Sequence, residues 1–352
     1  MRIADLETPC VLIDLDLAEE NLARAQAYAD AHGLKLRPHI KTHKLPFFAH
    51  RQLALGAVGI TCQKLGEAEV MADSGIADIL VPFNILGAAK LARLRALHTR
   101  IAIAVSADSP DTIEGYAQVF ADPAHPLAVM IECDTGAGRC GVQTPEQALA
   151  LARQIHAAPG LRFSGLLTYP PRGGAAEAER WLAHAKALIE AAGIPVPAIS
   201  NGGSPDLYAA AEVPSATEHR PGTYIYSDRM QVAFGLGTLA QCALSVLATV
   251  VSRPTPARAV LDAGSKALAA DLCPAPGHGH VVEYPDVLVA SLSEEHATLD
   301  LSGSEARPLI GARVRVIPNH ACVVSNLFDH VHLVRGEEVV ERLPVAARGR
   351  VD

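Results

Sequence analysis

The segment Leu34-Lys35-Leu36-Arg37-Pro38-His39-Ile40-Lys41-Thr42-His43-Lys44 decides how the first two-thirds of this chain is interpreted. Its apolar start predicts a strand over residues 34–40, and Lys41 follows where that strand gives way to a loop. Within residues 37–44, three cationic side chains and two imidazoles crowd together. Such crowding lowers the pKa of a lysine and yields the neutral amine that attacks a carbonyl carbon. Lys41 is therefore a candidate anchor for a Schiff-base cofactor such as pyridoxal phosphate, and a basic surface turn is the alternative.

This strand is the first of a series in which short β-branched runs alternate with Ala/Leu-rich stretches of helical spacing. The predicted strands are residues 34–40, 57–61, 79–82, 101–105, 128–133, 162–168, 198–200 and 216–220. The predicted helices include residues 16–31, 64–74, 86–97, 109–120, 145–157, 175–192 and 205–211. Such a series predicts an α/β fold, a (β/α)8 TIM-type barrel with its active site at the C-terminal ends of the strands. A doubly wound open sheet is the competing architecture, because the pattern does not show whether the sheet closes.

The composition changes after about residue 235. Residues 242–253, 259–262, 281–291, 297–301, 312–317 and 331–334 read as strands, without long helices between them. This pattern predicts a second, smaller and mainly antiparallel β domain. We therefore expect a barrel domain over residues 1–237, whose first few residues could join the β domain, and a β domain over residues 238–352.

Composition excludes several classes of function. The 352 residues carry a net charge of −8 and no basic tract, which argues against nucleic-acid binding. There is no run of eighteen apolar residues, and residues 1–7 lack the apolar core of a signal peptide, so no membrane span is predicted and a cytoplasmic location is expected. Seven cysteines without CxxC spacing fit reduced thiols better than a disulfide framework.

Two loops are candidates for binding a phosphate group. Ser200, Gly202, Gly203 and Ser204 lie in a loop between a predicted strand and a predicted helix. Glycines let the backbone approach an anion closely, and the amides at a helix start point toward it. Residues 220–224 end the next strand and could add Thr223 and Tyr224 to the same phosphate. A tight turn is the alternative for the glycine loop.

Arg139 and Tyr169 follow the fifth and sixth predicted strands. Arg139 could lie near the ring of a cofactor, or it could form an internal ion pair that supports its own loop. Tyr169 could lie against a planar ring, or it could fill a gap at the mouth of the barrel.

His320 and Cys322 form the candidate metal site. On an extended segment, side chains at i and i+2 share one face, and an imidazole and a thiolate so placed make a two-ligand site. The soft sulfur favours Zn²⁺, and two protein ligands leave positions open for water or a substrate hydroxyl. A histidine beside a buried free cysteine is the alternative.

Together these residues resemble the D-threonine aldolase and D-serine dehydratase family, fold-type III pyridoxal-phosphate enzymes related to alanine racemase. The Thr8-Pro9 opening, residues 37–44, 134–141, 200–204 and 220–224, and the His320/Cys322 pair fall in the family's order and approximate spacing. The resemblance thus covers nearly the whole chain. It implies an alanine-racemase-like barrel followed by a β domain, usually as a homodimer with active sites near the subunit interface.

The resemblance also implies a role for each candidate residue. Lys41 would carry pyridoxal 5'-phosphate as a Schiff base, and His320 and Cys322 would bind a divalent metal (Zn, Mn or Mg) beside the substrate. The residues that would hold the phosphate are Gly202, Gly203, Ser204, Thr223 and Tyr224. One departure concerns the tyrosine after the sixth strand, which relatives commonly follow with a Gly-His pair. Residues 169–174 hold no histidine, so proton transfer would fall to metal-bound water or another group.

The predicted function is that of a pyridoxal-phosphate- and metal-dependent lyase. It would cleave a D-β-hydroxy-α-amino acid to glycine and an aldehyde, as a D-threonine aldolase does. A D-serine dehydratase uses the same residues, with Lys41 removing the α-proton, and forms pyruvate and ammonia. Amino-acid racemisation needs bases on both ring faces and no metal. A non-catalytic pyridoxal-phosphate carrier is the last alternative, although such proteins are usually a lone barrel.

Overall fold

The computed structural model describes all residues from Met1 to Asp352. Contacts divide the chain into two compact units, each made of several segments. The barrel unit comprises Ala25–Lys41, Pro46–Gly222 and Arg350–Asp352. The β unit comprises Met1–Arg24, Thr42–Leu45 and Thr223–Gly349. The domain boundary expected at residue 237 stays a prediction.

The barrel unit contains an eight-stranded sheet in which all neighbours run parallel. The strands are β2 (Lys35–Leu36), β3 (Ile60–Thr61), β4 (Asp78–Val81), β5 (Ala102–Ala107), β6 (Leu127–Cys133), β7 (Leu161–Thr168), β8 (Ile199–Asn201) and β9 (Glu218–His219). Their order is β2-β9-β8-β7-β6-β5-β4-β3, and a parallel bridge between His39 and Thr61 joins the two ends. The sheet therefore closes, the TIM-type barrel is confirmed, and the open-sheet alternative is wrong.

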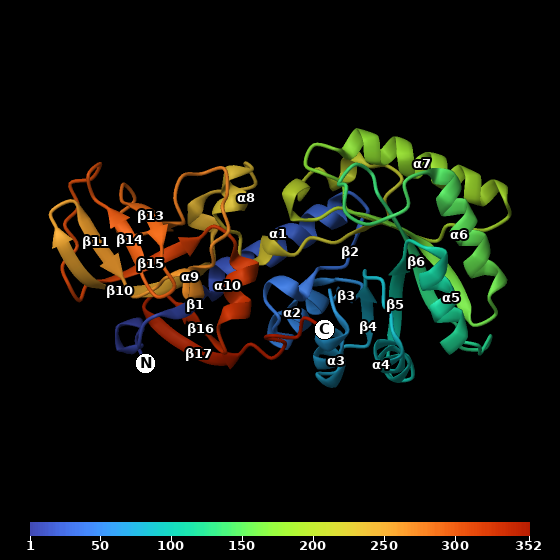
Figure 1. The fold of residues 1–352 in the computed structure, drawn as a ribbon, viewed down its shortest axis with the longest axis horizontal. Helices are drawn as coiled ribbons and strands as arrows, with labels where there is room; N and C mark the ends of the chain where they lie inside the picture. The colour runs from blue at the N-terminus through green and yellow to red at the C-terminus, as the bar shows by residue number, and fades with distance from the viewer. The chain divides into compact units, whose positions relative to one another are not determined.

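Helices cover the outside of this barrel (Figure 1). They are α2 (Pro46–Leu55), α3 (Leu65–Asp73), α4 (Ala88–His98), α5 (Pro110–Val119), α6 (Pro145–Ala157) and α7 (Ala175–Ala191). Helix α6 has the predicted bounds because its start is encoded locally: Thr144 and Gln147 form a capping box around Pro145. The predicted helix over residues 205–211 is wrong. Two 3₁₀ turns, η3 (Ser204–Asp206) and η4 (Ala210–Glu212), occupy this stretch, which is too short to nucleate a stable helix.

The β unit is built on a nine-stranded sheet in the order β11-β14-β13-β12-β15-β10-β1-β16-β17. Its strands are β1 (Cys10–Asp14), β10 (Leu244–Thr255), β11 (Arg258–Leu261), β12 (Gly279–Val281), β13 (Leu288–Leu292), β14 (Ala297–Asp300), β15 (Arg313–Pro318), β16 (His330–Arg335) and β17 (Glu338–Pro344). An additional β10–β11 pairing closes six of them into an antiparallel barrel. The mainly antiparallel β domain is thus confirmed.

Two details of this unit differ from the prediction. The single strand expected over residues 281–291 is in fact β12 and β13, because Pro285 lies between them and cannot donate to a ladder. Strand β1 was not predicted, and it pairs parallel with β16 and antiparallel with β10. Figure 1 shows this N-terminal strand, in blue, beside the C-terminal strands in red.

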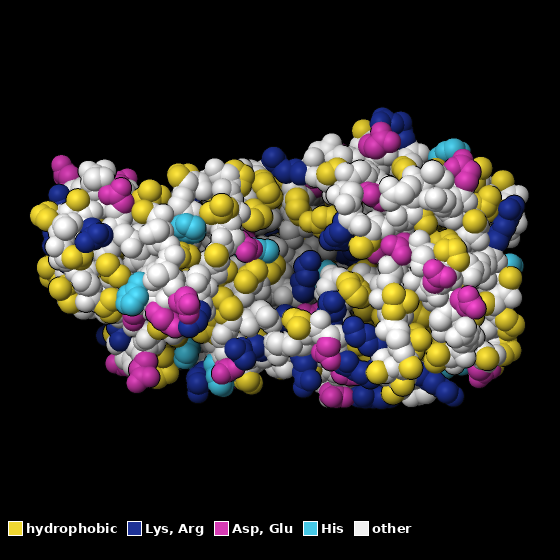
Figure 2. Space-filling model, viewed as in Figure 1, with side chains coloured by type: hydrophobic (Ala, Val, Ile, Leu, Met, Phe, Trp, Pro, Cys, Tyr) yellow, Lys and Arg dark blue, Asp and Glu magenta, His cyan; other side chains and the backbone are white.

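Short helices complete the β unit: α8 (Arg229–Ala233), α9 (Ser265–Leu268) and α10 (Ala321–Leu327). Helix α1 (Leu15–Ala31) begins in the β unit and ends in the barrel unit. None of the helices has both the length and the apolar character that a membrane span requires. On the face shown in Figure 2, acidic and basic side chains are interspersed over each unit.

Candidate active site

Lys41 lies just beyond the C-terminal end of strand β2. The strand ends at Leu36, earlier than predicted, and the chain then passes through the bridge at His39 into the 3₁₀ turn η2 (Ile40–Thr42). The Lys41 amide donates to Nδ1 of His39 at 3.4 Å, and Nε2 of His39 lies 3.0 Å from Oε1 of Gln63. The lysine side chain is half-buried. It therefore occupies the end of the barrel at which active sites of this fold form.

The basic side chains near Lys41 are less crowded than the sequence suggests. Arg37 is bound by two carboxylates, at 2.5 Å to Asp78 and 2.7 Å to Glu218. These acids are the first residues of β4 and β9, so Arg37 is directed toward the N-terminal ends of the strands. Lys44 is buried and donates to the carbonyl of Ala347 at 3.2 Å. The proposed reactivity of Lys41 therefore rests on its position rather than on a cluster of cations.

The glycine loop after β8 is shaped as a tight cradle. Gly202 has a φ of 84°, in the left-handed region that glycine adopts most readily. A Cβ atom on Gly203 would lie 2.4 Å from Cε2 of Tyr169, so only glycine fits against this ring. Oγ of Ser204 accepts a hydrogen bond of 3.0 Å from the amide of Gly222. This bond links the two loops that the sequence marked as a phosphate site.

Arg139 lies over the same aromatic ring. Its guanidinium is 5.0 Å from the ring centroid of Tyr169 and 3.7 Å from Oε1 of Glu132. The Arg139 side chain is exposed, whereas Tyr169 is half-buried. Burial raises the pKa of Glu132, while the nearby Arg139 lowers it. Arg139 thus forms the ion pair that was the alternative interpretation, and its position near the ring of a cofactor stays a prediction.

Arg220, for which the sequence predicted no role, is buried just after the end of β9. Its Nε donates to Oγ of Ser200 at 2.7 Å, and Nη2 donates to the carbonyl of Thr168 at 2.5 Å. Ser200 in turn donates to Oε1 of Glu218 at 2.5 Å, and the other oxygen of Glu218 accepts from Arg37. Burial lowers the pKa of Arg220, and Glu218 raises it again. The signal was present, because Arg220 opens the second predicted phosphate loop.

In the β unit, His320 and Cys322 flank the start of helix α10. His320 is the N-cap residue, with extended backbone, and Cys322 lies in the first helical turn. The expectation that both residues share one extended segment is therefore wrong, yet their side chains still form a hydrogen bond. Nδ1 of His320 is hydrogen-bonded to Oδ2 of Asp271, a partner that no local sequence pattern indicates. A carboxylate in this position orients an imidazole toward a metal.

The electrostatics of this pair are coupled. The hydrogen bond with Cys322 raises the pKa of His320 to about 9. Burial alone would raise the pKa of the Cys322 thiol, but the hydrogen bond with His320 lowers it overall. The sulfur also lies 3.1 Å from Oγ1 of Thr42 and 3.4 Å from Oγ1 of Thr223. Tyr224, the next residue, is buried within the turn η5 (Thr223–Ile225). The structure contains no group of three or more potential metal-ligating side chains.

The buried carboxylate of Asp228 fixes the helix that carries Cys322. Asp228 caps α8 by accepting from the amide of Gln231 at 2.9 Å, and it accepts from the amide of Ala321 at 3.0 Å. Asn319 is held by Arg229 through a 2.6 Å hydrogen bond to Oδ1. Asp228 is separated from α10 by more than ninety residues, so no local pattern indicates its role.

The closed parallel barrel with a lysine at the C-terminal end of its first strand, together with the β barrel, defines an alanine-racemase-like two-domain protein. The model "Alanine racemase, N-terminal domain" matches residues 13–230, and "Putative serine dehydratase domain" matches residues 243–334. The chain belongs to the D-threonine aldolase and D-serine dehydratase family.

Individual relatives match over nearly their whole length. A D-threonine aldolase from Arthrobacter sp. is 36% identical, with 99% of this chain and 94% of the relative covered. A D-threo-3-hydroxyaspartate dehydratase from Delftia sp. is 34% identical, with 92% and 93% covered. The crystal structure of D-threonine aldolase from Filomicrobium marinum superposes with a TM-score of 0.93 at 32% identity, covering 100% of this chain and 98% of that one.

Proposed function

We propose that this protein is a pyridoxal-phosphate- and divalent-metal-dependent lyase that cleaves D-threonine-like β-hydroxy amino acids to glycine and an aldehyde. The names of its relatives support a reaction at the β-carbon of D-amino acids. The observation that carries the proposal is that the candidate cofactor anchor and a neighbour of the candidate metal ligand are consecutive residues. Lys41 is followed directly by Thr42, whose hydroxyl lies 3.1 Å from the sulfur of Cys322. The candidate anchor is therefore one residue away from a contact of the candidate metal ligand.

The glycine loop after β8 fits a phosphorylated, planar cofactor. A Cβ on Gly203 would clash with Tyr169, so glycine at this position lets the loop backbone pack directly against that ring. In our proposal Lys41 anchors the cofactor, and Arg139 and Tyr169 lie beside its ring. The hydroxyl of Ser200 already bonds two side chains, so we assign it to positioning Arg220. The remaining proposed cofactor-binding residues, Gly202, Gly203, Ser204, Thr223 and Tyr224, hold the phosphate. When bound, pyridoxal phosphate supplies an electron sink for the bond-breaking step.

The donor set of the β unit fits a divalent cation. The side chains of His320 and Cys322 are hydrogen-bonded to each other, and a metal bound by both would displace the proton between them. Asp271 would keep Nε2 of His320 directed toward that metal. The thiolate favours Zn²⁺ over Mn²⁺ or Mg²⁺. A bound cation supplies Lewis acidity toward a substrate hydroxyl.

A dehydratase is the second candidate function, because one relative at 34% identity carries that name. The two reactions require protons to leave different atoms. Aldol cleavage needs the β-hydroxyl proton removed, whereas dehydration needs the α-proton removed. The Lys41 amine is the candidate base for the α-proton, and loop 169–174 offers no imidazole for either task.

The test is incubation of the purified protein with D-threonine and with D-serine, before and after chelation. Glycine and acetaldehyde support the aldolase, and pyruvate supports the dehydratase. Racemisation that resists chelation would defeat both. Lys41→Ala should lose the cofactor's absorbance, whereas His320→Ala should retain it and lose activity. Full activity in His320→Ala would remove the metal from the proposal.

We further propose that the enzyme is a cytoplasmic homodimer. Light scattering of the purified protein tests whether it is a dimer.

A further inference from the structure

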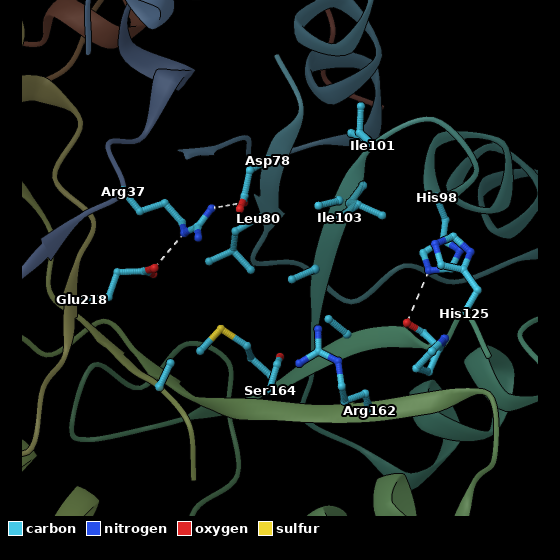
Figure 3. Close-up of a pocket in the computed structure, with 16 residues that line it drawn as sticks. Arg37, Asp78, Leu80, His98, Ile101, Ile103, His125, Arg162, Ser164 and Glu218 are labelled. Atoms are coloured by element: carbon cyan, nitrogen blue, oxygen red, sulfur yellow. Dashed lines mark hydrogen bonds and ion pairs between the residues drawn. The ribbon is translucent and has the colours of Figure 1, made fainter. Parts of the chain in front are cut away.

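The barrel unit contains a cavity at the end opposite to Lys41. This basal cavity has a volume of about 420 Å³ and lies among the N-terminal ends of the strands (Figure 3). Asp78, Ala102 and Glu218, which line it, are the first residues of β4, β5 and β9. Lys41, by contrast, follows the C-terminal end of β2. The basal cavity is therefore separate from the proposed cofactor site.

The basal cavity exists because small side chains replace the usual filling of a barrel. The interior of such a barrel is normally packed with layers of bulky branched residues. Here Ala104, Ala128 and Ala198 line the space, and Leu80 and Met130 complete its apolar walls. The size and mainly apolar lining are those of a small-molecule site.

A β-bulge directs a polar side chain into this space. The register of β6 and β7 pairs Val129 with Phe163 and Met130 with Gly165, which leaves Ser164 as the extra residue. Bulges of this kind re-aim a side chain. The hydroxyl of Ser164 lines the cavity, is shielded from solvent and has no hydrogen-bond partner. A buried hydroxyl without a partner is unfavourable, so a ligand that bonded to it would remove that cost.

The basal cavity also contains one charge without a counter-ion. Arg37 and the buried Arg220 share the carboxylates of Asp78 and Glu218, so two positive and two negative charges balance one another here. Arg162, two residues before the bulge, forms no hydrogen bond and no ion pair in the structure. Figure 3 shows its side chain extending from β7 into the cavity, with Ser164 on one side of it and His98 and His125 on the other. The lining thus offers a single cation beside an apolar wall and a free hydroxyl.

We propose that the basal cavity binds a small monocarboxylate with an apolar body. The planar fork of a guanidinium matches a carboxylate and can bond both of its oxygens. One unpaired cation balances one negative charge, which favours a carboxylate over a phosphate dianion. The hydrocarbon part of the ligand lies against Leu80 and Met130, and the Ser164 hydroxyl donates to the carboxylate of the ligand.

Methionine methyl groups provide a selective test. The chain has four methionines, of which Met130 lines the basal cavity and Met230 belongs to the β unit beside Asn319. The cofactor-loaded protein, labelled with ¹³C at methionine methyls, is titrated with valerate, with neutral valeramide and with inorganic phosphate. Valerate should shift the Met130 signal in a saturable way and leave Met230 unchanged. Valeramide and phosphate should bind at least about tenfold more weakly, since a charge-assisted bond is lost or mismatched.

Variants separate the basal cavity from other sites. Arg162→Gln should weaken valerate binding about tenfold or more, because it removes the charge and keeps the length. Arg153→Gln, at another exposed arginine without a partner, is the matched control and should not change it. Ala104→Leu fills the cavity and should abolish the Met130 shift even if the arginine variant is poorly folded. Equal binding of valeramide or phosphate, unchanged affinity in Arg162→Gln, or no saturable shift of Met130 would overturn the proposal.

Discussion

Replacing Glu218 with glutamine removes one charge from the interior of the barrel and changes little else. This carboxylate bonds Arg37 on one side and Ser200 on the other, and Ser200 holds Arg220. The Glu218 side chain is only 9% exposed, and Arg220 is buried. In the variant, the positive charges of Arg37 and Arg220 lose one neighbouring negative charge in a region of low dielectric constant. The free energy of unfolding should therefore fall.

The magnitude follows from the remaining partners. Removing one member of a buried ion pair typically costs about 3–5 kcal/mol. Arg37 keeps Asp78, and Arg220 keeps the attraction of Glu132, so the lower end, about 3 kcal/mol, is expected. With a urea m-value of about 3 kcal/mol/M, the unfolding midpoint should fall by about 1 M.

The chain offers both a probe and a control for this experiment. Its single tryptophan, Trp181, lies in α7 and reports on the barrel unit. Glu69→Gln is the matched control, because Glu69 pairs with Arg93 in the same unit but at the surface. That variant should lose about 0–1 kcal/mol. If Glu218→Gln, measured by Trp181 fluorescence of the cofactor-free protein, loses no more than the control, the claim that the interior arginines need this carboxylate is refuted.

Three further predictions concern the cofactor, the pH and the metal. Gly203→Ala places a Cβ 2.4 Å from the Tyr169 ring and should weaken pyridoxal-phosphate binding about tenfold in a cofactor titration. Gly115→Ala is the control and should not change the affinity, because its Cβ would lie 3.9 Å from the nearest atom, in Leu91. Burial lowers the pKa of His219 from 6.5 to about 4, so the unfolded state binds the proton first as the pH falls. The contribution of neutral His219 to the free energy of unfolding is complete above pH 6.5 and should decline by about 3 kcal/mol toward pH 4. Urea unfolding of a His219→Asn variant should lack this pH dependence, and the same slope in the variant would contradict the prediction. Asp271→Asn should weaken Zn²⁺ binding about 10–100-fold in a metal titration, and unchanged affinity would deny this carboxylate a role in orienting the metal ligand.

The local sequence predicted those elements whose signals are contained within a few residues. Strands such as β4 and β6 are short, mainly buried apolar runs, and helix α6 begins where Thr144 and Gln147 cap it. Local patterns failed where a single residue interrupts an apolar stretch, as Pro285 does between β12 and β13. They also failed over residues 205–211, where the stretch is too short to sustain a helix.

The sequence by itself determined the order of the βα units, the lysine at the end of the first strand and the His-x-Cys pair. Only the tertiary structure decided what surrounds them. Asp271 meets His320 across 49 positions of the chain, and Glu218 meets Arg37 across 181. The unpaired Arg162 faces a cavity lined by alanines from β5, from β6 and from the residue just before β8. Such neighbours arise only when a sheet closes on itself, because closure brings together side chains that no local spacing connects.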